Sequence, residues 1–146
     1  MISNNNFFEN LKYKLKKKEA VICIIGLGYV GLELLKGFQK KNFKLIGIDS
    51  DKKKISNIKK NKKTQLTTNY KNAKYADIII IALPTPLTKS LTPDLSFIKS
   101  CLKSIKNYLK KGQLISLEST TYPGTSEEII GKFLSKQKFK LSEDFF

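Results

Sequence analysis

The sequence predicts an α/β fold in which a parallel sheet carries helices on both of its faces. Short apolar runs alternate with stretches of helical periodicity along almost all of the 146 residues. The runs at residues 21–25 and 77–82 are almost continuously apolar, which is typical of strands buried on both faces of a sheet. A chain of this length buries about 68–70% of its unfolded surface, so we expect one domain with a substantial core.

A helix is expected before the first strand. Within residues 5–18, Phe8, Leu11 and Leu15 recur at helical spacing. The basic face of this helix could touch a membrane, but we expect its apolar face to pack on the domain. We therefore divide the chain into an N-terminal amphipathic helix, residues 1–19, and a domain of residues 20–146.

The first strand, residues 21–25, is followed by a glycine-rich turn and a predicted helix over residues 29–41. At this junction residues 26–31 read Gly-Leu-Gly-Tyr-Val-Gly. The pattern G-x-G-x-x-G is a weak signal alone. Between a buried strand and a helix it is the fingerprint of dinucleotide binding in a Rossmann-type, doubly wound sheet.

Each glycine of the fingerprint has an expected role. Gly26 would permit the tight turn, Gly28 would let the backbone approach a pyrophosphate, and Gly31 would let the helix pack against the strand. The N-terminus of the helix then offers free N–H groups and a partial positive charge to the phosphates.

The second strand, residues 43–48, ends at Asp49, which follows Gly31 by 18 residues. A carboxylate at this position can accept hydrogen bonds from both ribose hydroxyls and repel a 2′-phosphate, which favours NAD over NADP. The alternative is that Asp49 merely caps the next helix, residues 52–60. Asp51 is the better candidate for that cap.

The remaining elements continue the alternation. A weak third strand is expected at residues 65–68, and the strong fourth strand at 77–82 is broken by Pro84 and Pro86. Asp94 is expected to cap a helix that Gly112 terminates. The apolar face of that helix comprises Leu95, Ile98, Cys101, Leu102, Ile105 and Leu109.

The last part of the chain predicts a fifth strand, a further helix and the start of a sixth strand. The fifth strand is expected at residues 114–118, and the helix begins at Thr125 or Ser126 and reaches about Leu134. Residues 139–146 would begin the sixth strand, so the sheet is expected to be truncated near that strand.

Composition excludes several classes of site. The net charge is +16, yet every basic residue is Lys and these are scattered, so we expect a solvated surface without specific nucleic-acid recognition. The alternative is a surface that binds polyanions.

The absence of His excludes Ser-His-Asp chemistry and histidine-ligated metal within the chain. Cys23 and Cys101 are expected to be small core residues. No signal peptide or membrane span is expected, which predicts a cytoplasmic protein.

Two further motifs accompany the glycine loop. One is Leu-Pro-Thr-Pro-Leu-Thr-Lys at residues 83–89, followed by Pro-Asp-Leu-Ser at 93–96; the other is Leu-Glu-Ser-Thr-Thr-Tyr-Pro-Gly-Thr at 117–125. With residues 26–31 they resemble the UDP-glucose/GDP-mannose dehydrogenase family, above all its UDP-N-acetylglucosamine 6-dehydrogenase branch. Turn chemistry accounts for the prolines. Turn chemistry does not explain why both loops lie at the carboxyl ends of strands, which is where open α/β sheets bind their ligands.

The resemblance implies an oxidoreductase in which NAD oxidises the C6 alcohol of a nucleotide sugar to a carboxylate. It places Tyr29 and Val30 along the pyrophosphate and Asp49 on the adenosine ribose. Lys54 would be a basic cofactor contact, although the position also suits a plain surface lysine.

Two threonines complete the site that the resemblance implies. Thr85 would lie beside the cofactor after the fourth strand. Thr120 would lie near the nicotinamide, where the family uses a threonine hydroxyl to hold a catalytic water. Thr120 is thus the one candidate catalytic residue, and no metal is implied.

Two features depart from the family. Only residues 57–70 join the region after Asp49 to the fourth strand, where the family has another helix and loop. The family's substrate half, with its catalytic Lys, Asn and nucleophilic Cys, would follow residue 146. We therefore expect the NAD-binding half of a nucleotide-sugar 6-dehydrogenase, inactive alone and completed by a possible complementary chain. The alternatives are a non-catalytic dinucleotide-binding or regulatory module, and a basic nucleic-acid-binding protein.

Overall fold

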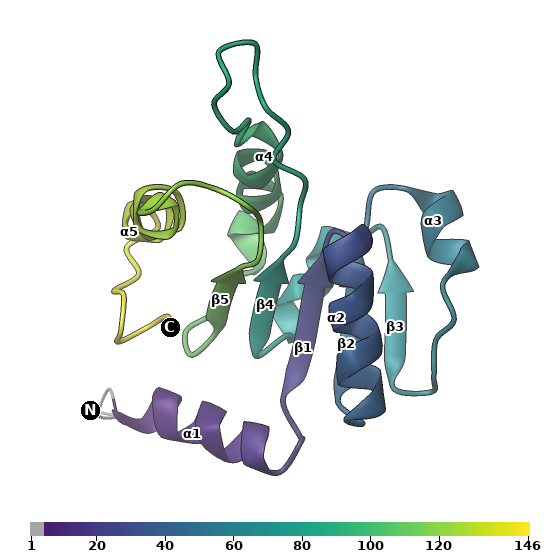
Figure 1. Cartoon of the computed structure of the whole chain (residues 1–146). Helices are drawn as coiled ribbons and strands as arrows, with labels where there is room; N and C mark the ends of the chain where they lie inside the picture. Colours follow the sequence, from purple (N-terminus) through teal and green to yellow (C-terminus); the bar gives the residue numbers. More distant parts are fainter. Residues whose placement is uncertain (1–4) are drawn as a thin grey trace.

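The computed structural model describes residues 5–146, and its centre is one five-stranded sheet (Figure 1). All neighbouring strands are parallel, in the order β3-β2-β1-β4-β5, which confirms the predicted fold class. The strands are β1 (Val21–Ile25), β2 (Lys44–Ile48), β3 (Thr64–Thr67), β4 (Ile78–Ile81) and β5 (Leu114–Leu117).

The strand order reverses direction between β1 and β4. From β1 the chain runs outward through β2 to β3, and it then returns to place β4 on the other side of β1. In open α/β sheets the crevice at such a switch point, at the carboxyl ends of the strands, is where ligands bind.

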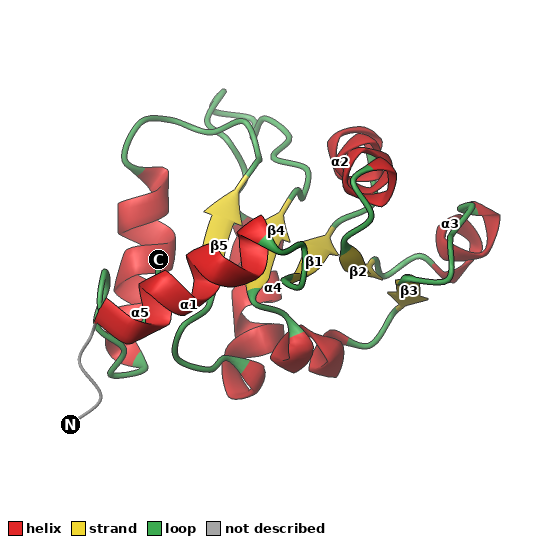
Figure 2. Cartoon of the chain, turned by 90° about the horizontal axis from the view of Figure 1, so that it is seen from below, coloured by secondary structure: helices red, strands yellow, loops and turns green. Residues whose placement is uncertain are grey.

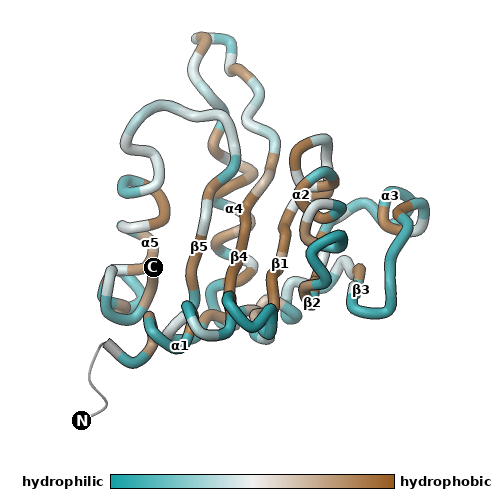
Figure 3. The backbone as a smooth tube through the Cα atoms, turned by 60° about the horizontal axis from the view of Figure 1, so that its bottom comes forward, coloured by the Kyte–Doolittle hydropathy of each residue, from teal (hydrophilic) through white to brown (hydrophobic). Residues whose placement is uncertain are grey.

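Helices cover both faces of the sheet (Figure 2). In β1, Ile22 and Ile24 face the side of α2, whereas Cys23 and Ile25 face the side of α4. The two central strands, β1 and β4, are accordingly apolar along their length in Figure 3. The helical segments are α1 (Asn5–Lys16), α2 (Tyr29–Lys40), α3 (Lys52–Asn57), η1 (Tyr70–Tyr75), α4 (Ser96–Ile105), η2 (Lys106–Tyr108), η3 (Ser126–Gly131) and α5 (Lys132–Lys136).

The N-terminal helix α1 crosses the end of the sheet opposite the glycine loop (Figure 1). Leu11 is buried in the core on the α2 side. Lys14 Nζ lies 2.7 Å from Asp77 Oδ1, and the other carboxylate oxygen of Asp77 accepts a hydrogen bond from Val21 N at 2.9 Å. One partly buried aspartate thus binds both the helix and the start of β1.

Several predicted boundaries need correction. α3 ends at Asn57 rather than Lys60. Leu95 occupies the N-cap position of α4, while Asp94 Oδ1 accepts a hydrogen bond from Ser96 N at 2.8 Å, so Asp94 stabilises the first turn from one residue earlier. α4 ends at Ile105 and passes into the 3-10 turn η2.

Two further segments differ from expectation. The short link after β3 is filled by η1, a 3-10 helix that the sequence did not predict. The expected sixth strand is reduced to its last residues: Ile115 N donates to Phe146 O at 2.8 Å, and Phe146 N donates to Gln113 O at 3.1 Å. These bonds place Phe145 beside β5 in parallel orientation.

Among residues 5–146, none of the helices has the length and apolar character needed to cross a bilayer. Both cysteines are buried and free, as expected of core residues.

Candidate functional site

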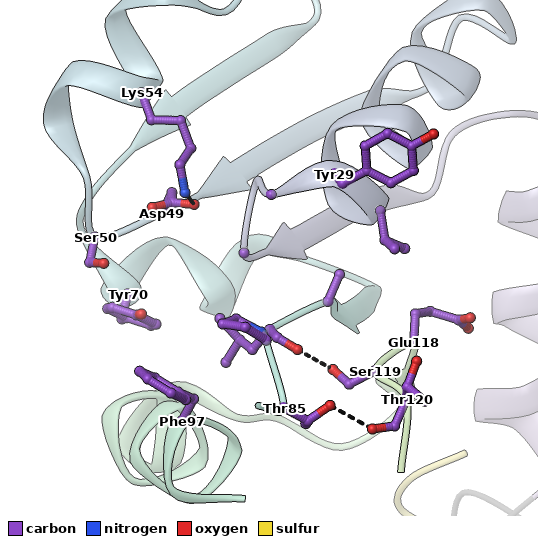
Figure 4. A pocket seen from close by; sticks show the side chains of 16 residues that line it. Tyr29, Asp49, Ser50, Lys54, Tyr70, Thr85, Phe97, Glu118, Ser119 and Thr120 are labelled. Atoms are coloured by element: carbon purple, nitrogen blue, oxygen red, sulfur yellow. Dashed lines mark hydrogen bonds and ion pairs between the residues drawn. The ribbon is translucent and has the colours of Figure 1, made fainter. Parts of the chain in front are cut away.

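A cleft of about 450 Å³ lies at the carboxyl ends of β1, β2, β4 and β5, at the switch point of the sheet (Figure 4). Its walls come from the glycine loop, from the end of β2 with α3, and from the loops that follow β4 and β5. The lining residues are Gly26, Gly28, Tyr29, Val30, Asp49, Ser50, Lys54, Tyr70, Ala82, Leu83, Pro84, Thr85, Phe97, Glu118, Ser119 and Thr120.

The glycine loop requires glycine at two positions for packing. Gly26 has φ +91°, in the left-handed region, and a Cβ there would lie 2.5 Å from the carbonyl oxygen of Ala82. A Cβ on Gly31 would lie 1.8 Å from the carbonyl oxygen of Gly26, so only glycine lets α2 pack this closely on the end of β1. Gly31 supports the cleft from behind and does not line it.

Gly28 is different, because nothing in the protein lies within 4 Å of the Cβ it lacks. It occupies the N-cap position of α2, and no side chain caps that helix. The first amides of α2 therefore face a space that no side chain of the loop fills. An anionic group fits there, since the N-terminus of a helix offers N–H donors and a partial positive charge.

Asp49 follows β2 directly and is buried, with 6% of its surface exposed. Its Oδ2 accepts hydrogen bonds from Leu27 N and Lys54 Nζ, each at 2.8 Å, and its Oδ1 accepts one from Asp51 N at 2.9 Å. The carboxylate therefore joins the glycine loop to the start of α3, and Oδ1 retains acceptor capacity for a hydroxyl group.

The environment of Asp49 keeps it ionised. Burial alone would raise the pKa of the Asp49 carboxyl. The hydrogen bond from Lys54 and those from the amides of Asp51 and Leu27, with the charge of Lys54, outweigh burial and hold the pKa below its ordinary value. The cap of α3 is Asp51, which accepts from the amides of Lys53 and Lys54. Capping by Asp49 is thereby excluded.

The loops after β4 and β5 are tied together across the cleft. Thr85 Oγ1 donates to the carbonyl oxygen of Thr120 at 2.5 Å, and Ser119 Oγ donates to that of Leu83 at 2.7 Å. Figure 4 shows these two bonds at the end of the cleft away from Asp49. The hydroxyl of Thr85 is thus turned toward the neighbouring loop, and Thr120 is exposed at the cleft wall.

The structure gathers the residues predicted from the motifs around one cleft, with Gly31 behind it. Sequence reasoning missed eight lining residues: Ser50, Tyr70, Ala82, Leu83, Pro84, Phe97, Glu118 and Ser119. Most of them stand within or beside the recognised motifs, so their neighbours could have revealed them. Tyr70 lies outside every motif and Phe97 directly follows the one at residues 93–96, and the fold brings both rings to the site.

The donor set of the cleft suits a dinucleotide rather than a metal ion. Free amides at a helix start match a pyrophosphate, and a buried ionised carboxylate beside them matches ribose hydroxyls. In the part of the chain that the structure describes, no three Cys, Asp or Glu side chains come together as metal ligands.

Comparison with known proteins agrees with this geometry. Residues 20–66 and 58–145 match the model of the UDP-glucose/GDP-mannose dehydrogenase family, NAD binding domain. A UDP-N-acetyl-D-mannosamine dehydrogenase of Methanocaldococcus jannaschii is 37% identical over 136 residues, covering 80% of this chain and 32% of the relative. A UDP-N-acetyl-D-glucosamine 6-dehydrogenase of Pseudomonas aeruginosa is 31% identical over 145 residues, covering 88% of this chain and 34% of the relative.

Solved structures show the same relation. The UDP-N-acetyl-mannosamine dehydrogenase Cap5O of Staphylococcus aureus superimposes with a TM-score of 0.77 at 26% identity, covering 86% of this chain and 35% of Cap5O. The present chain thus spans about a third of the length of the relatives it matches.

Proposed function

This chain belongs to the UDP-glucose/GDP-mannose dehydrogenase family as its NAD-binding domain, and from that membership we propose that it is the cofactor-binding part of a nucleotide-sugar 6-dehydrogenase. The relatives' names favour a UDP-N-acetylhexosamine, such as UDP-N-acetylglucosamine or its manno epimer, as the sugar nucleotide. The reaction would oxidise the C6 alcohol to a carboxylate.

The observation that carries this proposal is the buried carboxylate of Asp49, hydrogen-bonded to the glycine loop through Leu27 N. In the proposed complex the loop at Gly28, Tyr29 and Val30 holds the pyrophosphate, and Asp49 accepts from the adenosine ribose. Lys54 neutralises part of the charge around this end of the cofactor.

The other end of the cleft would hold the reactive ring. NAD, when bound, supplies the hydride acceptor. Thr85 would support the cofactor from the loop after β4, and the Thr120 hydroxyl would position a water molecule near the nicotinamide. The two hydrogen bonds between the β4 and β5 loops fix the spacing of these threonines.

Cofactor choice tests the proposal. NAD should bind more tightly than NADP, because a 2′-phosphate would approach the ionised Asp49. Asp49→Ala should weaken NAD binding and narrow the difference between the two cofactors. Glu33→Ala is the matched control, since Glu33 is an exposed carboxylate on α2 that pairs with Lys36 and does not line the cleft. Calorimetric titration of the three proteins with NAD and with NADP measures the six affinities. Equal or tighter binding of NADP by the unmodified chain would contradict the proposal.

We also propose that these 146 residues bind NAD without oxidising a nucleotide sugar. The resemblance requires a thiolate nucleophile, and the chain has only Cys23 and Cys101. Burial raises the pKa of the Cys101 thiol to about 12. Burial, with the nearby Cys101, raises the pKa of Cys23 still further. Neither forms a thiolate near neutral pH, and neither lines the cleft.

Turnover is measured by NADH absorbance with UDP-N-acetylglucosamine, UDP-N-acetylmannosamine and UDP-glucose. Each sugar is tested with the chain alone and with a separately expressed substrate domain of a relative. We expect no turnover by the chain alone, and any activity should require the added domain, which would act as its complementary chain. Sustained NADH production by these 146 residues alone would show that the chemistry has been misplaced.

A further inference from the structure

Two aromatic side chains that no motif contains line the cleft, and one of them, Tyr70, also packs against the core of the sheet. Tyr70 opens the 3-10 helix η1, and Phe97 is the second residue of α4. Phe97 leaves 46% of its surface exposed, although exposing an aromatic ring of this size forgoes the free energy of burying it. In the wall of a cleft, this exposed ring offers a flat apolar surface to a ligand.

Both rings lie at the Asp49 end of the cleft. In Figure 4 they stand below Asp49 and Ser50, whereas Glu118 and Thr120 lie at the opposite end. Tyr70 is half-buried and packs against the core, and burial raises the pKa of its phenol, as do the nearby Cys101 and Asp49. Its ring is therefore held in place before any ligand arrives.

The covalent structure of a dinucleotide limits what can reach these rings. The adenosine ribose is bonded to the pyrophosphate on one side and directly to the base on the other. If Asp49 holds the ribose and the glycine loop holds the pyrophosphate, the base extends away from the loop, toward Tyr70 and Phe97. Tyr29 is not an alternative partner, because it lies across the glycine loop from Asp49 and is 90% exposed.

We propose that Tyr70 and Phe97 form the aromatic wall on which the adenine ring of the cofactor rests. This inference depends on the proposed function, because Asp49 must hold the adenosine ribose for the base to reach them. Flat contact between a base and aromatic side chains is tolerant of sequence context and contributes appreciably to affinity. The two rings would thereby determine how strongly the adenosine half of the cofactor is held.

The test uses the full chain and two ligands, NAD and ADP-ribose, which lacks nicotinamide but keeps the adenosine half. Tyr70→Leu and Phe97→Leu retain apolar bulk and remove the flat ring. Each should weaken both ligands about tenfold, which corresponds to a loss of about 1.4 kcal/mol. The loss should be equal for NAD and ADP-ribose, because the nicotinamide end is untouched.

Two controls separate ring contact from a general loss of structure. Tyr70→Phe keeps the ring and should bind both ligands as the unmodified chain does. Tyr75→Ala removes an exposed tyrosine from the same 3-10 helix, outside the cleft, and should also leave binding unchanged. Circular dichroism of every variant checks that the sheet is retained.

The outcomes distinguish the two proposals. If the unmodified chain binds both ligands and the leucine variants bind them equally well, the aromatic wall is refuted while the proposed function stands. Weakened NAD binding with unchanged ADP-ribose binding would place the rings at the nicotinamide and also refute the wall. Failure of the unmodified chain to bind either ligand would refute the proposed function and the wall together.

Discussion

The carboxylate of Asp49 combines a structural and a functional role in one side chain. It accepts hydrogen bonds from two backbone amides and one lysine, and so fixes the glycine loop relative to α3. The same ionised group is the feature that selects against a 2′-phosphate in the proposed complex. Residues with both roles cannot be replaced without changing stability as well as affinity.

The lowered pKa of Asp49 predicts how its stabilising contribution depends on pH. Asp49→Asn keeps the shape but removes the charge, and should lower the free energy of unfolding by about 1–2 kcal/mol at neutral pH. A carboxyl whose pKa is lowered by folding stabilises the protein fully above its ordinary pKa, near 3.8. That contribution disappears as the pH falls through the lowered value.

Urea titrations of both proteins between pH 7 and pH 3 measure this difference in the free energy of unfolding. The gap between wild type and variant should be constant from neutral pH down to about pH 5, and it should shrink below 3.8. A gap that persists unchanged at the acid end, or that widens there, would contradict the assigned charge state.

At the scale of the element, the turn from β1 into α2 contains glycines with different functions, which substitution can separate. Gly31→Ala places a methyl group against the carbonyl of Gly26 and should destabilise the fold by about 1–3 kcal/mol. Gly28→Ala meets no protein atom, so the protein should fold normally but lose NAD affinity, because the methyl group enters the phosphate space.

Gly37→Ala is the control, since Gly37 lies in the middle of α2 with open space at its missing Cβ. It should raise stability by up to about 1 kcal/mol and leave NAD binding unchanged. Thermal denaturation and calorimetric titration of the three variants are sufficient. Unchanged NAD affinity in Gly28→Ala would show that the cofactor does not approach the loop there.

The sequence predicted all five strands, most clearly β1 and β4, whose side chains meet the requirements of a doubly buried sheet, and most weakly the polar β3. The runs at β1 and β4 are almost purely β-branched, and burial on both faces leaves such segments no competing structure. Helix ends were less predictable, because short helices without a strong terminating residue end where tertiary packing ends. α3 stops at Asn57 although lysines continue beyond it, because Ile58 adopts an extended conformation and packs on the core.

The candidate site was predictable where local sequence dictates local geometry. Glycine at 26 and 31 and an acid at the end of β2 are such positions, and so are the hydroxyl-rich loops after β4 and β5. Tyr70 and Phe97 reach the cleft only through the placement of η1 and α4. The residues around Tyr70 do not distinguish it from a core aromatic, and the motif before Phe97 does not specify a ring at that position.

At the scale of the whole molecule, the N-terminal helix is secured by a site far from the cleft. Asp77, at the amino end of β4, is 13% exposed at its side chain and serves both Lys14 and Val21 N. Asp77→Ala would leave the Val21 amide without its partner and should cost about 1–3 kcal/mol in the free energy of unfolding.

The matched control for Asp77 is Glu9→Ala, which breaks an exposed ion pair with Lys12 and should cost less than about 1 kcal/mol. Urea denaturation compares the two, and limited proteolysis reports release of α1. NAD affinity should be unchanged in both, because Asp77 lies at the opposite end of the strand from the cleft. Equal losses in the free energy of unfolding for the two substitutions would refute the role of Asp77 in holding α1 and the start of β1.

The dependence of the glycine loop on Ala82 and Asp49 has a consequence for the order in which the molecule acquires its structure. The loop leaves β1 early in the chain, but it rests on the end of β4, and Val21 and Asp77 are 56 residues apart in sequence. A nascent chain that has emerged only as far as β3 contains the entire fingerprint and still lacks the strand that shapes it. Parallel pairings of such separation close late and slowly during folding. We therefore expect the chain to become able to bind the cofactor only when the sheet closes around β1, and we expect residues 26–31 without β4 to lack the shape that binding requires.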